Sequence, residues 1–382
     1  MSCRICGLVI RAGRHELFRG RSAICLTCFR SITIAPHKLP RLLLGLGAVF
    51  LLLVQQDVLA GGSRAPYNVG RVSEPRLFAE GIISTQDDEA GGTFSPDGSE
   101  FYFVKFTQYT TFPRMGLICV SHFRHAAWSQ PEVVSFSGRD LDFPPKISPD
   151  GKTMYFSSFR PAPGKAEHAF RMWAVDRVGD GWGEPRLLPA TVNAEKSANF
   201  APSVTRDRTL YFTSTREGGK PHIYRSRFVD GSYIEPEKLG PEINSEFNES
   251  DPYISPDETV LIFASSANNL GEPDRPETLH GGGVLYSRAD LYISTNIDRK
   301  WSQARHLGSN INSVAEEGSP SLTPDGKYLF FSSERSPFTV PTAHPLKYDE
   351  IEAMLHSTLN GHGNIFFISS DVLDFSNAHV RK

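Results

Sequence analysis

The sequence predicts an all-β protein in which residues 72–382 form a five-bladed β-propeller. Three observations lead to this prediction: a strand–turn–strand phrase occurs five times, its copies are almost evenly spaced, and the two ends of the region supply complementary strands. Ahead of the propeller, the sequence predicts a small zinc-knuckle module at 1–38, an apolar export or anchor segment at 39–60 and a linker at 61–71.

The repeated phrase is clearest in Leu322-Thr-Pro-Asp-Gly-Lys-Tyr-Leu-Phe-Phe-Ser-Ser333. Proline presets φ at the second turn position, aspartate suits the third, and glycine accepts the left-handed conformation that follows. The central residues of the five copies are Pro96, Pro149, Arg206, Pro256 and Pro324, which stand 53, 57, 50 and 68 positions apart. A period of about fifty with strand-forming residues is typical of propeller blades. Six blades is the alternative, if an irregular stretch hides another copy.

The ends of the region predict how the ring closes. Glu74-Pro-Arg-Leu-Phe-Ala79 matches the fourth strand of a blade, and Gly363-Asn-Ile-Phe-Phe-Ile-Ser-Ser370 matches a third strand. We therefore expect 75–79 to pair with 365–369 and to complete the last blade, which removes two exposed sheet edges. Before the fourth strands stand large aromatic residues that we expect to pack between blades: Trp128, Trp182 and Trp301.

Charge and cysteine are distributed unevenly along the chain. The net charge of −3 combines a net +7 over residues 1–41 with −10 over the remainder. A basic leader before an acidic body favours membrane targeting over nucleic-acid binding, so no nucleic-acid partner is expected. Four of the five cysteines precede residue 30, and Cys119 alone lies in the body, which excludes a disulfide within the propeller.

The N-terminal cysteines follow a zinc-binding pattern. Cys3, Cys6, Cys25 and Cys28 form two C-x2-C pairs, and four thiolates at this spacing can close a tetrahedral shell around Zn²⁺. With Leu17-Phe-Arg-Gly20 and the residues around the second pair, residues 1–32 resemble the zinc-binding domain at the start of the ClpX unfoldase. The resemblance implies that the four cysteines are zinc ligands. The chain has no GxxxxGK[ST] phosphate loop, so it does not contain the ATPase that follows this domain in that family.

An uncharged apolar run occupies residues 42–54 and is preceded by Lys38 and Arg41. Its thirteen residues are short for a bilayer span and suit a signal sequence, with small residues up to Ala60 at a peptidase site. Two interpretations stay open. The run is an uncleaved membrane anchor with a cytoplasmic N-terminus, or it is an export signal whose cleavage removes the zinc module. Either way, the propeller is expected to be periplasmic or secreted.

The turn phrases resemble the WD40-like, or PD40, repeats of TolB-type propellers. The likeness rests on the Ser-Pro-Asp-Gly-Lys-x-Leu-Tyr-Phe-Ser-Ser pattern and on the Ile-Asn-Ser steps at Ile243 and Ile311, and it covers residues 72–375. It implies an exported binding or scaffold protein by analogy.

A candidate site follows from one position that recurs in every blade. Six residues before each turn Ser or Thr stand Glu89, Asp142, Asn199, Glu249 and Glu317. Because first strands line a propeller's channel, we expect a polar ring near one mouth, joined by Arg160, Arg216 and Arg335. Four carboxylates there suit a hard cation such as Ca²⁺ or a cationic ligand. The structural alternative, which we favour, is that each carboxylate caps its own loop or pairs with a nearby arginine.

Insertions between second and third strands open on the same mouth, at 267–289 and 336–362. The second contains an amphipathic helix over 348–359, and insertions on one face usually mark the binding face. His168 and His222 begin third strands and are possible metal ligands, although locally hydrogen-bonded surface histidines are the favoured interpretation.

Known catalytic motifs such as GxSxG and HExxH do not occur in the sequence. The sequence therefore favours a non-catalytic binding or scaffold propeller with a protein or glycan ligand. The alternative is a carbohydrate-active hydrolase that uses two ring carboxylates as acid and base. Loss of a glycan turnover in Glu249→Gln or Glu317→Gln would discriminate in favour of the hydrolase.

Overall fold

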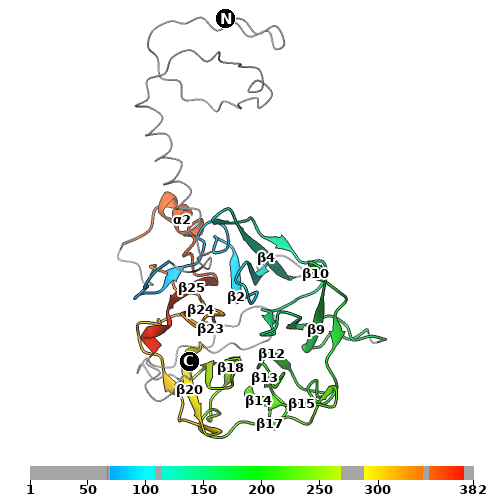
Figure 1. Cartoon of the computed structure of the whole chain (residues 1–382). Coiled ribbons are helices and arrows are strands. Elements are labelled where there is room, and N and C mark those ends of the chain that lie inside the picture. The colour runs from blue at the N-terminus through cyan, green and yellow to red at the C-terminus, as the bar shows by residue number, and fades with distance from the viewer. Residues whose placement is uncertain are drawn as a thin grey trace, which may run out of the picture. The chain divides into compact units, whose positions relative to one another are not determined.

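The computed structural model describes residues 67, 69–107, 114–164, 166–267, 288–338 and 344–373. Within them, five antiparallel sheets stand around a common axis, so five blades rather than six are confirmed (Figure 1). The predicted zinc module and apolar segment lie outside the described residues. Among the residues that are described, no helix is long and apolar enough to cross a membrane.

Each blade contains four strands, and the first strands of neighbouring blades contact one another around the axis. The first blade contains β2 (Asp88–Phe94), β3 (Glu100–Phe106), β4 (Gly116–Arg124) and β6 (Glu132–Val133). The second contains β7 (Lys146–Ile147), β8 (Thr153–Ser158), β9 (Arg171–Val178) and β11 (Arg186–Leu187). The third contains β12 (Asn199–Val204), β13 (Leu210–Ser214), β14 (His222–Ser226) and β17 (Glu237–Lys238). The fourth contains β18 (Glu249–Ile254), β19 (Val260–Ser265), β20 (Asp290–Ile297) and β22 (Arg305–His306).

The fifth blade joins the two ends of the chain. It contains β23 (Glu317–Leu322), β24 (Tyr328–Ser333), β25 (Asn364–Ser369) and, as its outermost strand, β1 (Arg76–Leu77). Arg76 pairs with Phe367, and the Phe78 amide donates to the Ile365 carbonyl at 2.9 Å. The predicted closure is therefore confirmed.

Short strands extend three of the blades: β5 (Ala127–Trp128) the first, β10 (Gly181–Trp182) the second and β21 (Lys300–Trp301) the fourth. In the third blade, β15 (Phe228–Val229) and β16 (Ser232–Tyr233) form a separate hairpin after β14, and two helical segments belong to the fifth. The helices are α2 (Tyr348–Leu355), inside the predicted span 348–359, and the 3-10 turn η2 (Ser370–Leu373).

In every blade the Ser or Thr hydroxyl of the turn phrase donates to the Asp two residues later. In the first, the Ser95 hydroxyl donates to Asp97 at 2.6 Å and accepts from the Glu100 amide at 2.9 Å. Gly98 follows in the left-handed region at φ 76°. Arg208 and Glu258 hold this conformation in the two copies that lack glycine, at φ 70° and 60°. These bonds explain why the phrase needs Ser or Thr, then Asp two residues later.

A second device fixes each blade to the one before it. The first-strand residue at the predicted ring position donates its amide to a carbonyl just before or at the start of the preceding blade's third strand. These bonds run from Glu89 to Gly363, Asp142 to Gly116, Asn199 to Phe170, Glu249 to Pro221 and Glu317 to Ala289, at 2.8–3.3 Å. The five bonds complete the ring, because the first blade is bonded to the fifth.

Two positions further on, the first strand bulges and turns another amide toward the preceding blade. The Gly91 amide donates to Ser332 Oγ at 2.6 Å, and equivalent bonds join Ala201 to Ser157 and Asp251 to Thr213 at 3.0 and 3.2 Å. In the second blade this position is Pro144, which has no amide hydrogen to satisfy.

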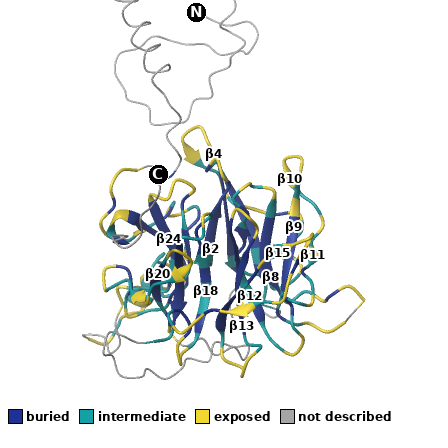
Figure 2. Cartoon of the chain, turned by 60° about the horizontal axis from the view of Figure 1, so that its bottom comes forward, coloured by how far each residue is buried: buried dark blue, intermediate teal, exposed yellow. Residues whose placement is uncertain are grey.

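Aromatic side chains fill the spaces between blades, and burial follows the strands while the connecting loops stay exposed (Figure 2). Trp128 packs on Phe78, Trp182 on Tyr102 and Trp301 on Tyr211, with ring centroids 5.5, 5.8 and 6.4 Å apart. Each pair joins residues of different blades, so the predicted role of these tryptophans is confirmed.

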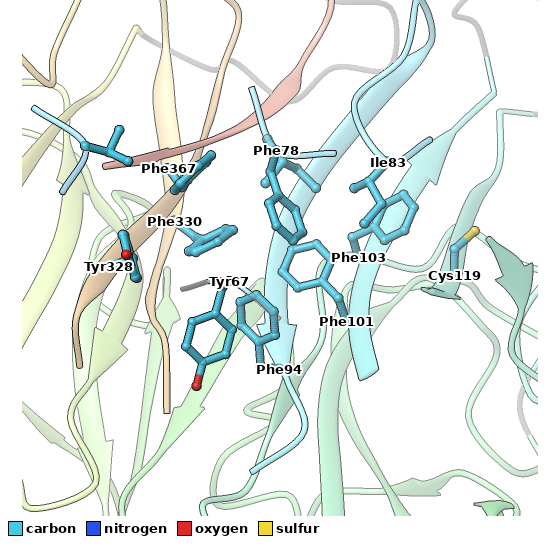
Figure 3. Packing of buried hydrophobic residues seen from close by; sticks show 12 residues of the cluster. Tyr67, Phe78, Ile83, Phe94, Phe101, Phe103, Cys119, Tyr328, Phe330 and Phe367 are labelled. Carbon is cyan, nitrogen blue, oxygen red and sulfur yellow. The ribbon is translucent and has the colours of Figure 1, made fainter. Parts of the chain in front are cut away.

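The segment that closes the ring, residues 75–79, supplies the centre of an aromatic cluster. Figure 3 shows Phe78 between Phe330 and Phe367 on one side and Phe101 on the other. Tyr67, within the predicted linker 61–71, is buried in the same cluster, with its ring centroid 4.9 Å from that of Phe94. Packing that belongs to the propeller therefore includes residue 67.

Candidate functional site

The five residues of the predicted ring are all buried, with 0–1% of each exposed. Their side chains bond within their own blades, and Glu249 also bonds to His222 of the preceding blade. In the fifth blade, Glu317 accepts from the amide and hydroxyl of Ser313 at 2.9 and 2.6 Å, from Ser333 Oγ at 2.7 Å and from Arg335 at 3.1 Å. Burial nonetheless raises the pKa of Glu317, against these bonds. The carboxylate thereby fastens the entry loop to the end of the second strand.

The three predicted arginines belong to these internal networks. The Arg335 guanidinium lies over the rings of Phe331 and Phe366, 5.3 and 4.8 Å from their centroids. Arg160 bonds to Asp142 at 2.8 Å, and Arg216 bonds to the Asn199 amide oxygen at 3.3 Å.

The two blades without such an arginine place another basic side chain beside the carboxylate. Lys105 lies 3.5 Å from Glu89, and His222 Nδ1 lies 2.9 Å from Glu249. Burial raises the pKa of Glu89 to about 7, although bonds from Thr85 oppose the shift. This arrangement agrees with the structural alternative stated for the ring, and the ligand-binding role of these residues stays a prediction.

The channel itself is lined by residues one or two positions away from the ring. A cavity of about 150 Å³ opens at the mouth where second strands end and third strands begin. Side chains alternate along a strand, so where Glu317 points into its blade, its neighbour Glu316 faces the cavity.

One side of this cavity is acidic. Glu316 directly precedes β23 and Glu334 directly follows β24, and the two oppose each other, with the Glu334 amide donating to the Glu316 carbonyl at 3.1 Å. Directly opposed residues place their side chains on one face, and like charges there are destabilising. Asp88 adds a third carboxylate, held by the Gly363 amide at 3.2 Å and 3.8 Å from the Arg114 guanidinium.

Burial and mutual repulsion disfavour the ionised forms of Glu316 and Glu334. Burial, with repulsion from Glu334, raises the pKa of Glu316 to about 8. Burial and the nearby Asp88 raise the pKa of Glu334 to about 7. Among the described residues, neither glutamate makes a salt bridge, and Arg288 acts on both from a distance while its guanidinium bonds to the Val314 carbonyl at 2.7 Å.

The opposite side of the cavity is aromatic. Phe106, Phe143, Phe170 and Phe200 line it and come from the first three blades. The rings of Phe143 and Phe170 have centroids 4.6 Å apart, and Phe170 stacks on Phe200 at 5.0 Å with planes only 13° apart. We call these four residues the phenylalanine wall.

Lys146 and Asp251 form the floor. Lys146 reaches from the second blade to the Pro320 carbonyl at 2.8 Å and to the Gly92 carbonyl at 3.5 Å, which belong to the fifth and first blades. It also lines a larger cavity of about 460 Å³ on the turn side, so its side chain separates the two chambers. Burial lowers the pKa of Lys146 to about 7, against the attraction of Asp251.

The described residues contain no group of three or more His, Cys, Asp or Glu arranged to hold a metal ion. The two candidate histidines have different partners. His168 Nδ1 bonds to the Phe159 carbonyl at 2.8 Å, and His222 bonds to the Glu249 carboxylate. The predicted zinc cysteines lie outside the described residues. Calcium in the channel stays an untested prediction.

The insertion in the fifth blade leads into the acidic side of the cavity. The Glu350 side chain accepts from the Lys347 amide at 2.8 Å and so caps the N-terminus of α2. Ile351 and Leu355, on the predicted apolar face, are 39% and 60% exposed. The chain then returns through His362 and Gly363 to β25. In the fourth-blade insertion, residues 268–287 lie outside the described part.

Comparisons with known proteins identify no family for this chain. No family model matches the chain, and no curated protein matches it. Among solved structures, a protein of Agrobacterium tumefaciens assigned as TolB is 15% identical with a TM-score of 0.40, over 74% of this chain and 90% of that one. A gluconolactonase from Xanthomonas campestris is 9% identical with a TM-score of 0.39, over 78% and 91%. A puromycin-hydrolysing peptidase of Mycobacterium tuberculosis is 11% identical with a TM-score of 0.35, over 72% and 41%.

Proposed function

We propose that the chain is a non-catalytic binding or scaffold propeller that acts outside the cytoplasm and seats part of a protein or glycan ligand in the mouth cavity. The observation that carries the proposal is the cavity itself, which combines an acid pair with no salt-bridge partner among the described residues and an aromatic wall at the axis. Concave sites with apolar walls and a few convergent polar groups are the usual form of ligand pockets. The location outside the cytoplasm rests on the predicted export segment at 42–54.

A filled-mouth variant tests this proposal. Ala90 lies on β2 and lines the cavity, so a ring at this position in Ala90→Phe would occupy the space. We expect the full-length protein to bind members of a peptide library or an oligosaccharide panel, and the variant to lose that binding while its melting temperature stays close to that of the wild type. Unchanged binding by a folded Ala90→Phe protein would overturn the proposal.

A second candidate function, a glycoside hydrolase, is favoured by one observation. Glu316 has a pKa of about 8, so it holds a proton near neutral pH, as a general acid must. In that case the full-length protein would hydrolyse chromogenic glycosides, and Glu316→Gln and Glu334→Gln would each abolish the turnover. Such an activity would displace the non-catalytic proposal.

A further inference from the structure

The mouth cavity divides into two halves of different chemistry, and each half limits what can enter. The acidic half belongs to the fifth and first blades, and the phenylalanine wall belongs to the first three. The other blades do not repeat the acid pair. The positions equivalent to Glu316 and Glu334 are Leu141 with Phe159, Ala198 with Thr215 and Asn248 with Ser266 in blades two to four. The acid pair is therefore specific to one side of the mouth and is not part of the repeat.

Glu316 and Glu334 lower the stability of the folded protein when no ligand is bound. Opposed carboxylates destabilise a sheet, and burial makes each charge harder to hold. The groups that act on the pair are Asp88, Asp251 and Glu317, which repel it, and Arg288 and His362, which attract it. Two further cations line the cavity: Arg114 lies over the Phe106 ring and 3.8 Å from Asp88, and Lys146 is bonded to the Pro320 carbonyl. An incoming cation would relieve the repulsion directly.

We propose that this cavity binds a cationic side chain, arginine or lysine, presented by a protein ligand, with the charge at Glu316 and Glu334 and the apolar stem against the phenylalanine wall. This inference rests on the proposed function and names the ligand group it recognises. A guanidinium offers a planar fork of donors that suits two carboxylates. Aromatic faces within about 6 Å attract the same cation.

Two other occupants fit less well. A hard metal ion such as Ca²⁺ takes six to eight oxygen ligands, and the described residues hold no metal-binding group of three. A sugar chain is neutral and would leave the acid pair uncompensated. The cavity of about 150 Å³ is also smaller than pockets for drug-sized ligands, which are roughly 300–1,000 Å³, and it suits one side chain.

The test compares two probes of equal shape. Calorimetry with the full-length protein at pH 8 would measure Nα-acetyl-arginine N-methylamide against the citrulline analogue, which lacks the charge. We expect the arginine probe to bind at least tenfold more tightly. We expect Glu316→Gln and Glu334→Gln each to weaken it at least tenfold, and Glu246→Gln, an exposed carboxylate before β18, to leave it unchanged. Equal affinities for arginine and citrulline would overturn the inference.

A measurement on the wild-type protein keeps the test independent of variant folding. A bound cation favours the ionised acids, so binding at pH 7.5 should release protons, and affinity should rise between pH 6 and 8.5. Calorimetry in buffers of different ionisation enthalpy measures that release. Binding without proton release would contradict a cation at these glutamates. Failure of the arginine probe with retained capture of another ligand at the mouth would overturn this inference alone. Loss of all capture would overturn the proposed function.

Discussion

The Asp251 carboxylate accepts hydrogen bonds from both the amide and the hydroxyl of Ser319, at 3.1 and 3.2 Å. At three other blade boundaries a second-strand hydroxyl of the preceding blade accepts the bulge amide, as Ser332 does for Gly91. In the fourth blade that position is Ala264, which has no hydroxyl. Asp251 therefore supplies the acceptor that its blade lacks, and it does so across the channel floor.

If Asp251 replaces the missing hydroxyl, adding a hydroxyl at Ala264 should compensate for the loss of Asp251. Asp251→Ala should lower the free energy of unfolding by about 1–3 kcal/mol, because the Ser319 amide is left without an acceptor. Ala264→Ser should restore part of that loss in the Asp251→Ala background and have little effect alone. Urea unfolding of the four proteins measures the coupling. If Ala264→Ser has the same effect in both backgrounds, Asp251 does not replace the hydroxyl.

The ligand-free protein should become less stable as pH rises from 5 to 6.5. Burial raises the pKa of Glu89 and of Glu334 to about 7 and that of Glu316 to about 8, from an ordinary value of 4.5. The folded state therefore binds more protons than the unfolded state in this range, and the free energy of unfolding falls with pH. Lys146, whose pKa is about 7, opposes the trend only at higher pH.

Urea midpoints at constant ionic strength measure this dependence. Glu316→Gln and Glu334→Gln should each flatten it, whereas Glu246→Gln should not. The turn aspartates do not interfere. Burial opposes the shift in most of them, yet hydrogen bonds from the turn hold their pKa values below the ordinary 3.8, as for Asp150 and Asp325. A midpoint that rises with pH over this range would show that the glutamates are ionised in the empty protein.

The repeat made the architecture predictable. Five copies of one phrase identify five blades, since each copy has the same hydroxyl–aspartate bonding, and the unmatched strand at Arg76 needs the partner that Phe367 provides. Hydrophobic and turn patterns follow from local geometry, so they are visible in one sequence.

The site could not be predicted in the same way. A residue that recurs in every blade, such as Glu317, recurs because each blade needs the same internal bonds. Its neighbour Glu316 faces the channel, and a one-residue step along a strand reverses the direction of the side chain. Only the fifth blade carries acids at both opposed positions, Glu316 and Glu334, and this departure from the repeat was the available signal. The phenylalanine wall depends on how the blades meet, which no single blade shows.

Replacing Arg335 and replacing Arg216, which occupy equivalent positions in the fifth and third blades, should lower the free energy of unfolding by different amounts. Arg335 and Arg216 each lie over two aromatic rings, but Arg335 faces the buried carboxylate of Glu317 and Arg216 faces the neutral amide of Asn199. The carboxylate nearest to Arg216, that of Glu235 at 3.7 Å, is exposed to solvent, where an ion pair contributes little. Arg335→Met should lower the free energy of unfolding by about 3–5 kcal/mol, because it leaves a buried charge uncompensated. Arg216→Met should cost about 1–3 kcal/mol.

A double variant separates charge from packing in that comparison. Glu317→Gln in the Arg335→Met background should recover part of the loss, because the amide needs no counter-ion. Denaturant midpoints at pH 7 measure all four proteins. Equal losses for Arg335→Met and Arg216→Met would mean that stacking on the aromatic rings, rather than charge pairing, sets the contribution of these arginines.

The closing strand should be the most sensitive segment outside the site. Phe78 is 5% exposed, and its ring lies within 6.0 Å of five others, among them Phe330 at 4.8 Å and Phe101 at 4.9 Å. Phe78→Ala removes a ring that joins the first and fifth blades, so it should lower the free energy of unfolding by about 3–5 kcal/mol. Phe338→Ala, at a ring that is 38% exposed, should change it by less than about 0.5 kcal/mol.

Chemical denaturation followed by tryptophan fluorescence suits this comparison, because Trp128 packs on Phe78 at 5.5 Å. A Phe78→Ala protein as stable as Phe338→Ala would show that backbone pairing of β1 with β25 closes the ring without this aromatic contact.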